Sequence, residues 1–175
     1  MSDPGSARIT GRRVLVGLGN RFRGDDRAGL EVAARLRERA PEDSEVVAIE
    51  GDPMALLDIF ADAELVLVAD AVATTVEPGT VYRFDASDGP IPGAIFGAST
   101  HAFGLAETIE LARALGKLRA RVLVYGITAA AFGAGDELSP AVASQIPVAV
   151  EQMLADLSLP GRQTSSSHQE EASHA

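Results

Sequence analysis

Three stretches of the sequence contain side chains that can do chemistry. Asp25 and Asp26 lie in the glycine-rich stretch 17–29, which follows an apolar run. Asp70 ends a second apolar run, and His101 stands at the start of a helical pattern. One carboxylate from the stretch 17–29, the carboxylate of Asp70 and a neutral imidazole form a hard to borderline ligand set, which suits a divalent metal ion with open coordination positions. The sequence has no cysteine, which excludes disulfides, thiolate metal sites and a cysteine nucleophile, so any metal must bind through oxygen and imidazole.

Each of these residues also has a purely structural interpretation. Asp25 and Asp26 begin a helical pattern, where carboxylates cap free N–H groups and meet the positive end of the helix dipole. Asp70 can simply bond a neighbouring loop. A protonated His101 would be unfavourable at a helix start, which favours a neutral, functional imidazole. It is also the one histidine inside the predicted fold, because the other two lie at positions 168 and 174.

The elements that must position these residues follow from hydrophobic periodicity. Short apolar runs predict strands at 13–19, 45–50, 64–70, 80–84 and 121–127, and amphipathic segments predict helices at 26–39, 53–60, 101–115 and 140–157. This alternation predicts an α/β protein of three α-β-α layers, with a mainly parallel five-stranded sheet and helices on both faces. The strand at 80–84 is expected at an antiparallel edge. Ligands of such sheets bind outside the carboxyl ends of the strands, so the three stretches share one rim.

Length and composition indicate one domain. The 175 residues are 46% hydrophobic and 23% charged, which is ordinary globular usage. We expect a single α/β domain over 13–157, a disordered N-terminal segment over 1–12, and a disordered C-terminal tail over 158–175, because both ends are polar and lack periodicity.

Charge and hydropathy exclude several classes of partner. Fifteen basic against 25 acidic residues give a formal net charge of −10, the wrong sign for binding a phosphate backbone, so nucleic acid is not expected. No apolar run approaches the roughly 20 residues that span a bilayer, and the N-terminus lacks the apolar stretch of a secretory signal. We therefore expect a cytoplasmic monomer without membrane contact.

Familiar catalytic motifs are missing. The stretch from Gly17 begins like a dinucleotide-binding GxGxxG loop, but Phe22 stands where the third glycine is needed. Neither the GxSxG elbow of serine hydrolases nor the HExxH helix of zinc proteases is present. A non-catalytic nucleotide or small-ligand binding module remains an alternative.

Four segments, in order along the chain, carry a family resemblance. They are VLVGLGNRFRGDDRAGLEVAARL, LVLVADAV, STHAFGLAETIELA and YGITAAAFGAGDELSPAVASQIPVAVEQML. The first is similar to an opening strand with a GxGNxxxxDDGxG loop and helix, and the second to a central strand that ends in Asp-Ala. The third is similar to a Ser-x-His-x-x-Gly-Leu helix start, and the fourth to a closing strand with a Leu-Ser-Pro helix. Together they resemble the hydrogenase maturation endopeptidases, which process the large subunit of nickel-iron hydrogenases.

The resemblance implies an aspartyl-type endopeptidase that removes the C-terminal extension of a hydrogenase large-subunit precursor. It places the family's metal-contacting acid at Asp26, its second carboxylate at Asp70 and its histidine at His101. It also implies that nickel arrives bound to cysteines of the precursor, so that no organic cofactor is needed. The substrate then brings the thiolates, and this chain adds oxygen and nitrogen ligands. A nickel-handling chaperone that uses the same rim without hydrolysis is a second alternative.

The chain departs from the family pattern at two places. Arg27 stands where glycine is common, and EGDPMALL (50–57) stands where many members have Asp-Gly-Gly-Thr, so the role of that stretch would pass to Glu50 or Asp52.

The geometry expected of the site is specific. Asp26, Asp70 and His101 should converge closely enough to share one ion at roughly 2.0–2.2 Å per ligand. Asp25 is assigned to the helix start, where asparagine caps nearly as well, so its replacement by asparagine is expected to be mild. Deletion of 160–175 is expected to matter least.

Overall fold

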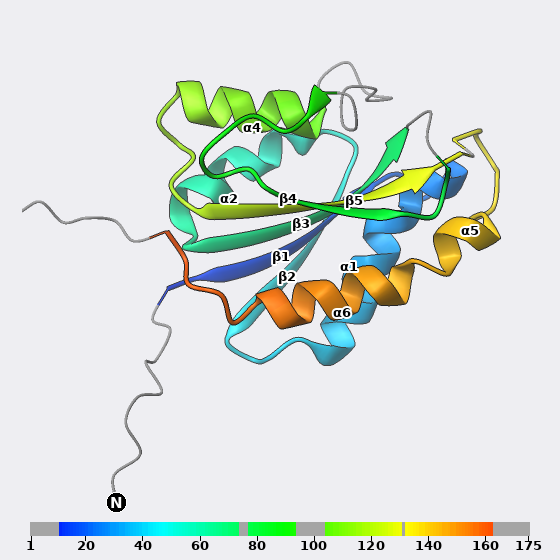
Figure 1. The fold of residues 1–175 in the computed structure, drawn as a ribbon, viewed down its shortest axis with the longest axis horizontal. Coiled ribbons are helices and arrows are strands. Elements are labelled where there is room, and N and C mark those ends of the chain that lie inside the picture. The colour runs from blue at the N-terminus through cyan, green and yellow to red at the C-terminus, as the bar shows by residue number, and fades with distance from the viewer. Residues whose placement is uncertain (1–10, 74–76, 94–103, 131, 163–175) are drawn as a thin grey trace, which may run out of the picture.

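The computed structural model describes residues 11–73, 77–93, 104–130 and 132–162. Its centre is a five-stranded sheet in the order β2-β1-β3-β5-β4 (Figure 1). The strands are β1 (Arg13–Gly19), β2 (Ser44–Glu50), β3 (Leu65–Ala73), β4 (Val81–Asp85) and β5 (Arg121–Ala129). β4 pairs antiparallel with β5 at one edge, and all other neighbours are parallel. The predicted fold class and the antiparallel edge strand are therefore confirmed.

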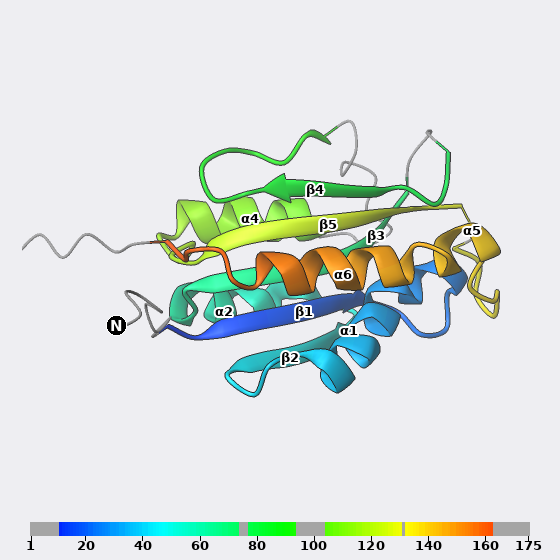
Figure 2. The same ribbon diagram turned by 60° about the horizontal axis from the view of Figure 1, so that its bottom comes forward.

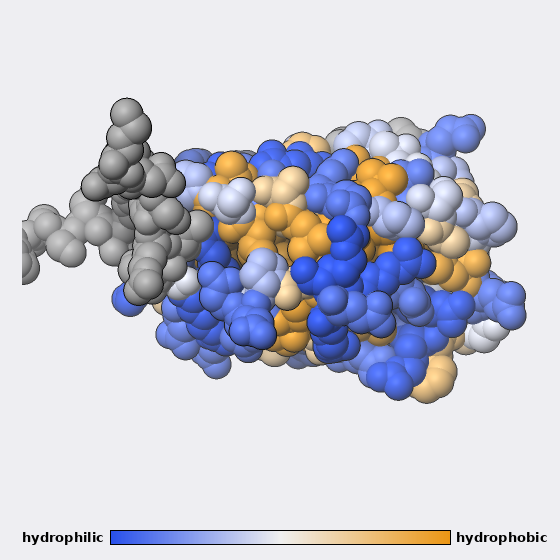
Figure 3. Space-filling view, turned by 90° about the horizontal axis from the view of Figure 1, so that it is seen from below, coloured by the Kyte–Doolittle hydropathy of each residue, from blue (hydrophilic) through white to orange (hydrophobic). Residues whose placement is uncertain are grey.

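Helices cover both faces of this sheet (Figure 2). One face carries α2 (Leu56–Asp62) and α4 (Leu105–Ala114), and the other carries α1 (Ala28–Arg39), α5 (Pro140–Ala143) and α6 (Ile146–Asp156). Two short 3-10 turns, η1 (Gly24–Arg27) and η2 (Pro53–Ala55), precede α1 and α2. In the view of Figure 3, hydrophilic residues form most of the surface, and hydrophobic ones show between them near its middle. In the part of the chain that the structure describes, no helix is both long and apolar enough to cross a membrane.

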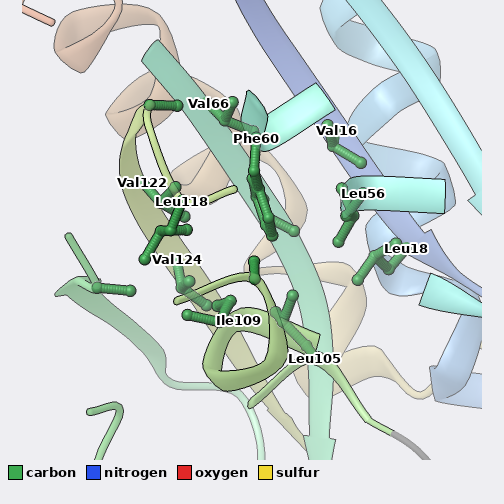
Figure 4. Packing of buried hydrophobic residues seen from close by; sticks show 14 of the residues in the cluster. Val16, Leu18, Leu56, Phe60, Val66, Leu105, Ile109, Leu118, Val122 and Val124 are labelled. Carbon is green, nitrogen blue, oxygen red and sulfur yellow. The ribbon is translucent and has the colours of Figure 1, made fainter. Parts of the chain in front are cut away.

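Side chains of the central strands alternate between two buried clusters. Val14 and Val16 of β1 face α2 and α4, whereas Leu15 faces α1 and α6. Figure 4 shows Phe60 of α2 in the middle of the first cluster, above Ile109 of α4. Because both faces are covered, the strands are apolar at successive positions instead of alternating with polar residues.

Two helices differ from their predicted bounds for identifiable reasons. The helix predicted from Asp26 begins two residues later, because 24–27 form a 3-10 turn. The helix predicted over 140–157 is divided into α5 and α6, and Pro147 lies in the first turn of α6. A proline lacks the N–H that a continuing helix requires, whereas the first turn of a new helix does not use that donor.

The C-terminal segment is held further than the sequence predicts. Arg13 donates to the carbonyl of Leu159 at 2.7 Å, and Arg162 donates to the carbonyl of Leu118 at 2.8 Å. Residues 158–162 thus pack against the domain, so the predicted tail boundary at 157 is too early. The rest of the predicted tail, 163–175, and residues 1–10 lie outside the described residues.

Candidate active site

The glycines after β1 permit an unusually close approach between helix and sheet. A Cβ on Gly29 would lie 2.1 Å from the carbonyl oxygen of Leu18 and 2.5 Å from that of Ala69, and a Cβ on Gly17 would lie 2.0 Å from the carbonyl oxygen of Gly29. No side chain fits at these distances, so the start of α1 lies directly against β1 and β3. The glycine-rich stretch is therefore explained by packing, without a bound phosphate, and it brings Asp26 beside the end of β3.

Asp70 occupies the strand position at which β1 and β3 separate. The register of these two strands ends at Gly17 and Ala69, whereas β3 continues beside β5 with Asp70 opposite Gly126. Successive side chains of a strand point to opposite faces. Because Val68 and Val72 belong to the cluster under α2 and α4, the partly buried Asp70 side chain lies on that same face.

Asp26 and Asp70 interact electrostatically. Asp26 is 3% exposed and belongs to η1, which packs against β3. Burial raises the pKa of Asp70 well above its ordinary value, the negative charge of Asp26 raises it further, and a hydrogen bond from the Ala71 backbone lowers it in part. Two nearby carboxylates that are shielded from solvent repel each other when both are ionised. The arrangement therefore favours a proton or a cation between them.

Asp25 does not have the role predicted from its position. Its Oδ1 accepts from the Ser139 backbone N–H at 2.7 Å, and its Oδ2 accepts from the Ser139 hydroxyl at 2.9 Å and from the Ala130 N–H at 3.2 Å. No side chain caps η1 or α1. The prediction that Asp25 caps this helix start is therefore wrong, because the fully buried carboxylate is turned toward the segment that follows β5. Sequence reasoning missed this long-range partnership with Ser139, whose hydroxyl also accepts from the Val142 N–H at the start of α5.

His101 lies outside the described residues, so its convergence with the two aspartates stays a prediction. What the structure does show is the helix that follows it. α4 begins at Leu105, and its first turn is closed by a hydrogen bond from the Gly104 N–H to Glu107 at 3.0 Å. Leu105 packs in the cluster under α2 and α4, so this helix starts on the face to which Asp70 points. Within the described ranges, no three acidic or histidine side chains are grouped for a metal ion.

The structure shows where the residues that depart from the family pattern lie, namely Glu50, Asp52 and Arg27. Asp52 accepts from the Met54 N–H at 2.9 Å and caps η2, and Glu50 forms an exposed ion pair with Arg21 at 2.5 Å. That hydrogen bond from Arg21 is the main reason why the pKa of Glu50 is lowered. Arg27 is partly buried, and its Nε is bonded to no group in the described part of the chain.

An open groove of about 440 Å³ lies beside the rim but does not contain the paired aspartates. Its lining residues come from α1, from β2 and from the loop after β1: Arg21, Leu30, Glu31, Arg37, Ala48 and Glu50. Since neither Asp26 nor Asp70 lines it, the groove is separate from the candidate site.

The fold and site define a doubly wound α/β protein with two interacting carboxylates, the buried Asp26 and the partly buried Asp70, at the carboxyl edge of its sheet. A sequence profile described as "Hydrogenase maturation protease" matches residues 30–156. The chain belongs to the hydrogenase maturation protease family. The matched range begins after Asp26 and includes Asp70 and His101.

Individual relatives and solved structures agree with this assignment. The chain is 31% identical over 152 residues to the hydrogenase expression/formation protein HupD of Rhodobacter capsulatus, covering 83% of this chain and 71% of that protein. It is 27% identical over 150 residues to the hydrogenase 2 maturation protease of Escherichia coli, covering 83% and 90%. The structure of the hydrogenase maturating endopeptidase HybD from Escherichia coli superimposes with a TM-score of 0.70 at 27% identity, covering 83% of this chain and 91% of that one. The HybD protease from Thermococcus kodakarensis gives 0.65 at 28% identity, covering 81% and 95%.

Proposed function

We propose that this protein is an endopeptidase that removes the C-terminal extension of a nickel-loaded large-subunit precursor of a nickel-iron hydrogenase. The observation that carries the proposal is the pairing of Asp26 and Asp70 at the carboxyl edge of the sheet, in a chain of the hydrogenase maturation protease family. A cation presented by the substrate would relieve the repulsion between the two carboxylates.

Nickel enters this proposal as cargo of the precursor. Asp26 and Asp70 would contact it through oxygen and His101 through nitrogen, while the thiolates come from the precursor. Carboxylate and imidazole are suitable nickel ligands in this mixed set. The absence of cysteine from the chain fits such a division, because the protease needs no thiolates of its own.

For the cleavage step, the site is compatible with two versions. In the first, the metal serves recognition only, and a carboxylate of the site acts as general base toward the water that attacks the scissile carbonyl. The competing version makes the metal a Lewis acid that polarises this carbonyl. Replacing nickel in the precursor by zinc or cadmium distinguishes them, since only Lewis-acid catalysis makes kcat follow the metal.

We also propose that the protein works as a cytoplasmic monomer. The lack of cysteine is compatible with a reducing compartment. Light scattering on the purified full chain, alone and with precursor, tests the oligomeric state.

The central experiment compares three substrates by mass spectrometry of the products. We expect cleavage of the nickel-loaded precursor, and none of the nickel-free precursor or of a short peptide that carries only the terminal sequence. Binding of the loaded precursor without cleavage would indicate a nickel-handling chaperone. Equal cleavage of loaded and nickel-free precursor would contradict nickel as the recognition element.

A further inference from the structure

Phe22 is the most exposed large hydrophobic side chain in the described part of the chain. It is 73% exposed, compared with 57% for Leu115 and 39% for Val148. Phe22 lies in the loop that follows β1, four residues before Asp26. Leu115 directly follows α4 and comes shortly before β5, which places it at the opposite, amino edge of the sheet. A large aromatic side chain is thus exposed on the rim that carries the paired aspartates.

The backbone under Phe22 is held on both sides. Its N–H donates to Asn20 Oδ1 at 2.9 Å, and its carbonyl accepts from the Gly135 N–H at 2.8 Å. The next residue, Arg23, donates from Nε to the carbonyl of Phe132 at 3.3 Å. An aromatic side chain with two χ angles on a fixed backbone loses little conformational entropy when a partner covers it.

The same two loops are joined a second time, deeper in the protein. Asp25 accepts two backbone N–H groups and one hydroxyl from the segment after β5, at 2.7–3.2 Å. Residues 20–27 and 132–139 are therefore joined by several hydrogen bonds, and we call them together the two-loop platform. Scattered exposed apolar residues are common and need no explanation. Phe22 differs because a buried, charge-assisted network fixes the platform that carries it.

We propose that Phe22 is the docking anchor through which this protein binds the hydrogenase precursor. The inference rests on the proposed function, because a polypeptide that presents its nickel to Asp26 and Asp70 must lie over the same rim. Arg21 and Arg23 flank Phe22 in sequence, and they are engaged with Glu50 and with the Phe132 carbonyl, so the matching surface of the precursor is an apolar depression with polar groups around it. Aromatic side chains are the residues that most often dominate such interfaces.

The test measures steady-state kinetics with nickel-loaded large-subunit precursor for the wild type and three variants. Phe22→Ala removes the anchor, Phe22→Leu keeps an apolar side chain, and Leu115→Ala is a matched truncation of an exposed side chain at the far edge. We expect Phe22→Ala to raise KM about tenfold or more, with the loss of kcat/KM lying in KM. Phe22→Leu should restore a large part of the affinity, and Leu115→Ala should match the wild type. All melting temperatures should agree, because the altered side chains are exposed.

The proposal is overturned if the KM of Phe22→Ala stays within twofold of the wild type, or if Leu115→Ala raises KM equally. A loss confined to kcat would also overturn it, because Phe22 would then act in the reaction and not in docking. The dissociation constant for the same precursor is measured in parallel. If the wild type binds but does not cleave, the proposed peptidase function fails, and the binding ratio between wild type and Phe22→Ala still decides the docking role. Absence of wild-type binding would overturn both.

Discussion

Replacing Asp25 by asparagine tests how the two-loop platform is held together. Both carboxylate oxygens accept hydrogen bonds, one from the Ser139 N–H and the other from the Ala130 N–H and the Ser139 hydroxyl. Asparagine has one acceptor oxygen, so in either orientation its NH2 group faces a backbone N–H. Hydrogen bonds to charged groups contribute about 1.5–3 kcal/mol each. Losing one and weakening the others is expected to lower the free energy of unfolding by about 3 kcal/mol. For a chain of this size that corresponds to a melting temperature about 6–12 °C lower.

Asp52→Asn provides the matched control. Asp52 is an exposed cap that accepts one backbone N–H, from Met54. Asparagine caps a helix about as well as aspartate, so this variant should stay within about 0.5 kcal/mol of the wild type. Urea unfolding and thermal melts of both variants provide the comparison. If Asp25→Asn is as mild as Asp52→Asn, the carboxylate is not the connection described here.

Five further variants test the site and the C-terminal segment. The pKa of the Asp70 carboxyl is raised, so the folded state binds the Asp70 proton more tightly than the unfolded state does, and stability falls as the pH rises above the ordinary aspartate pKa. Asp70→Asn should therefore raise the melting temperature at pH 8 and change it little near pH 3. The same variant should abolish cleavage. Asp26→Asn and His101→Ala should each lower precursor cleavage by more than about 100-fold, with circular dichroism showing a retained fold. Deleting 163–175 should leave the melting temperature unchanged, whereas deleting 160–175 removes the hydrogen bonds of Arg162 and should lower it by several degrees.

The strands were predictable because the pattern of apolar residues within each strand reflects how much of that strand is buried. RVLVGLG and RVLVYGI are apolar at successive positions, and both strands lie in the middle of the sheet with helices on each face. The shorter TVYRF alternates more, and it forms the antiparallel edge. Each pattern depends on the immediate surroundings of a strand, which a short window of sequence records.

Contacts between distant parts of the chain left no such local signal. Asp25 bonds Ser139, which is 114 positions away, although its neighbours in sequence resemble a helix cap. Residues 158–162 (Ser-Leu-Pro-Gly-Arg) lack periodicity and suggest a free tail, yet the carbonyl of Leu159 and the side chain of Arg162 bond to the domain. In both cases the deciding partner is a backbone group, and a backbone group is present at every position whatever the residue type. Local propensity therefore could not identify these connections.

The closeness of Asp26 and Asp70 was predictable for a different reason. Parallel strands deliver their carboxyl ends to one edge, so topology alone brings residues 44 positions apart to the same rim. The electrostatic repulsion between the two carboxylates could not be predicted from the sequence, because it depends on how closely the glycines let η1 approach β3. Under the proposed function, a proton and a substrate-borne cation would compete for the same two carboxylates. The two carboxylates repel each other when both are ionised, and this doubly ionised form is also the one that binds a cation best. We therefore expect the site to gain most from a metal that the substrate brings.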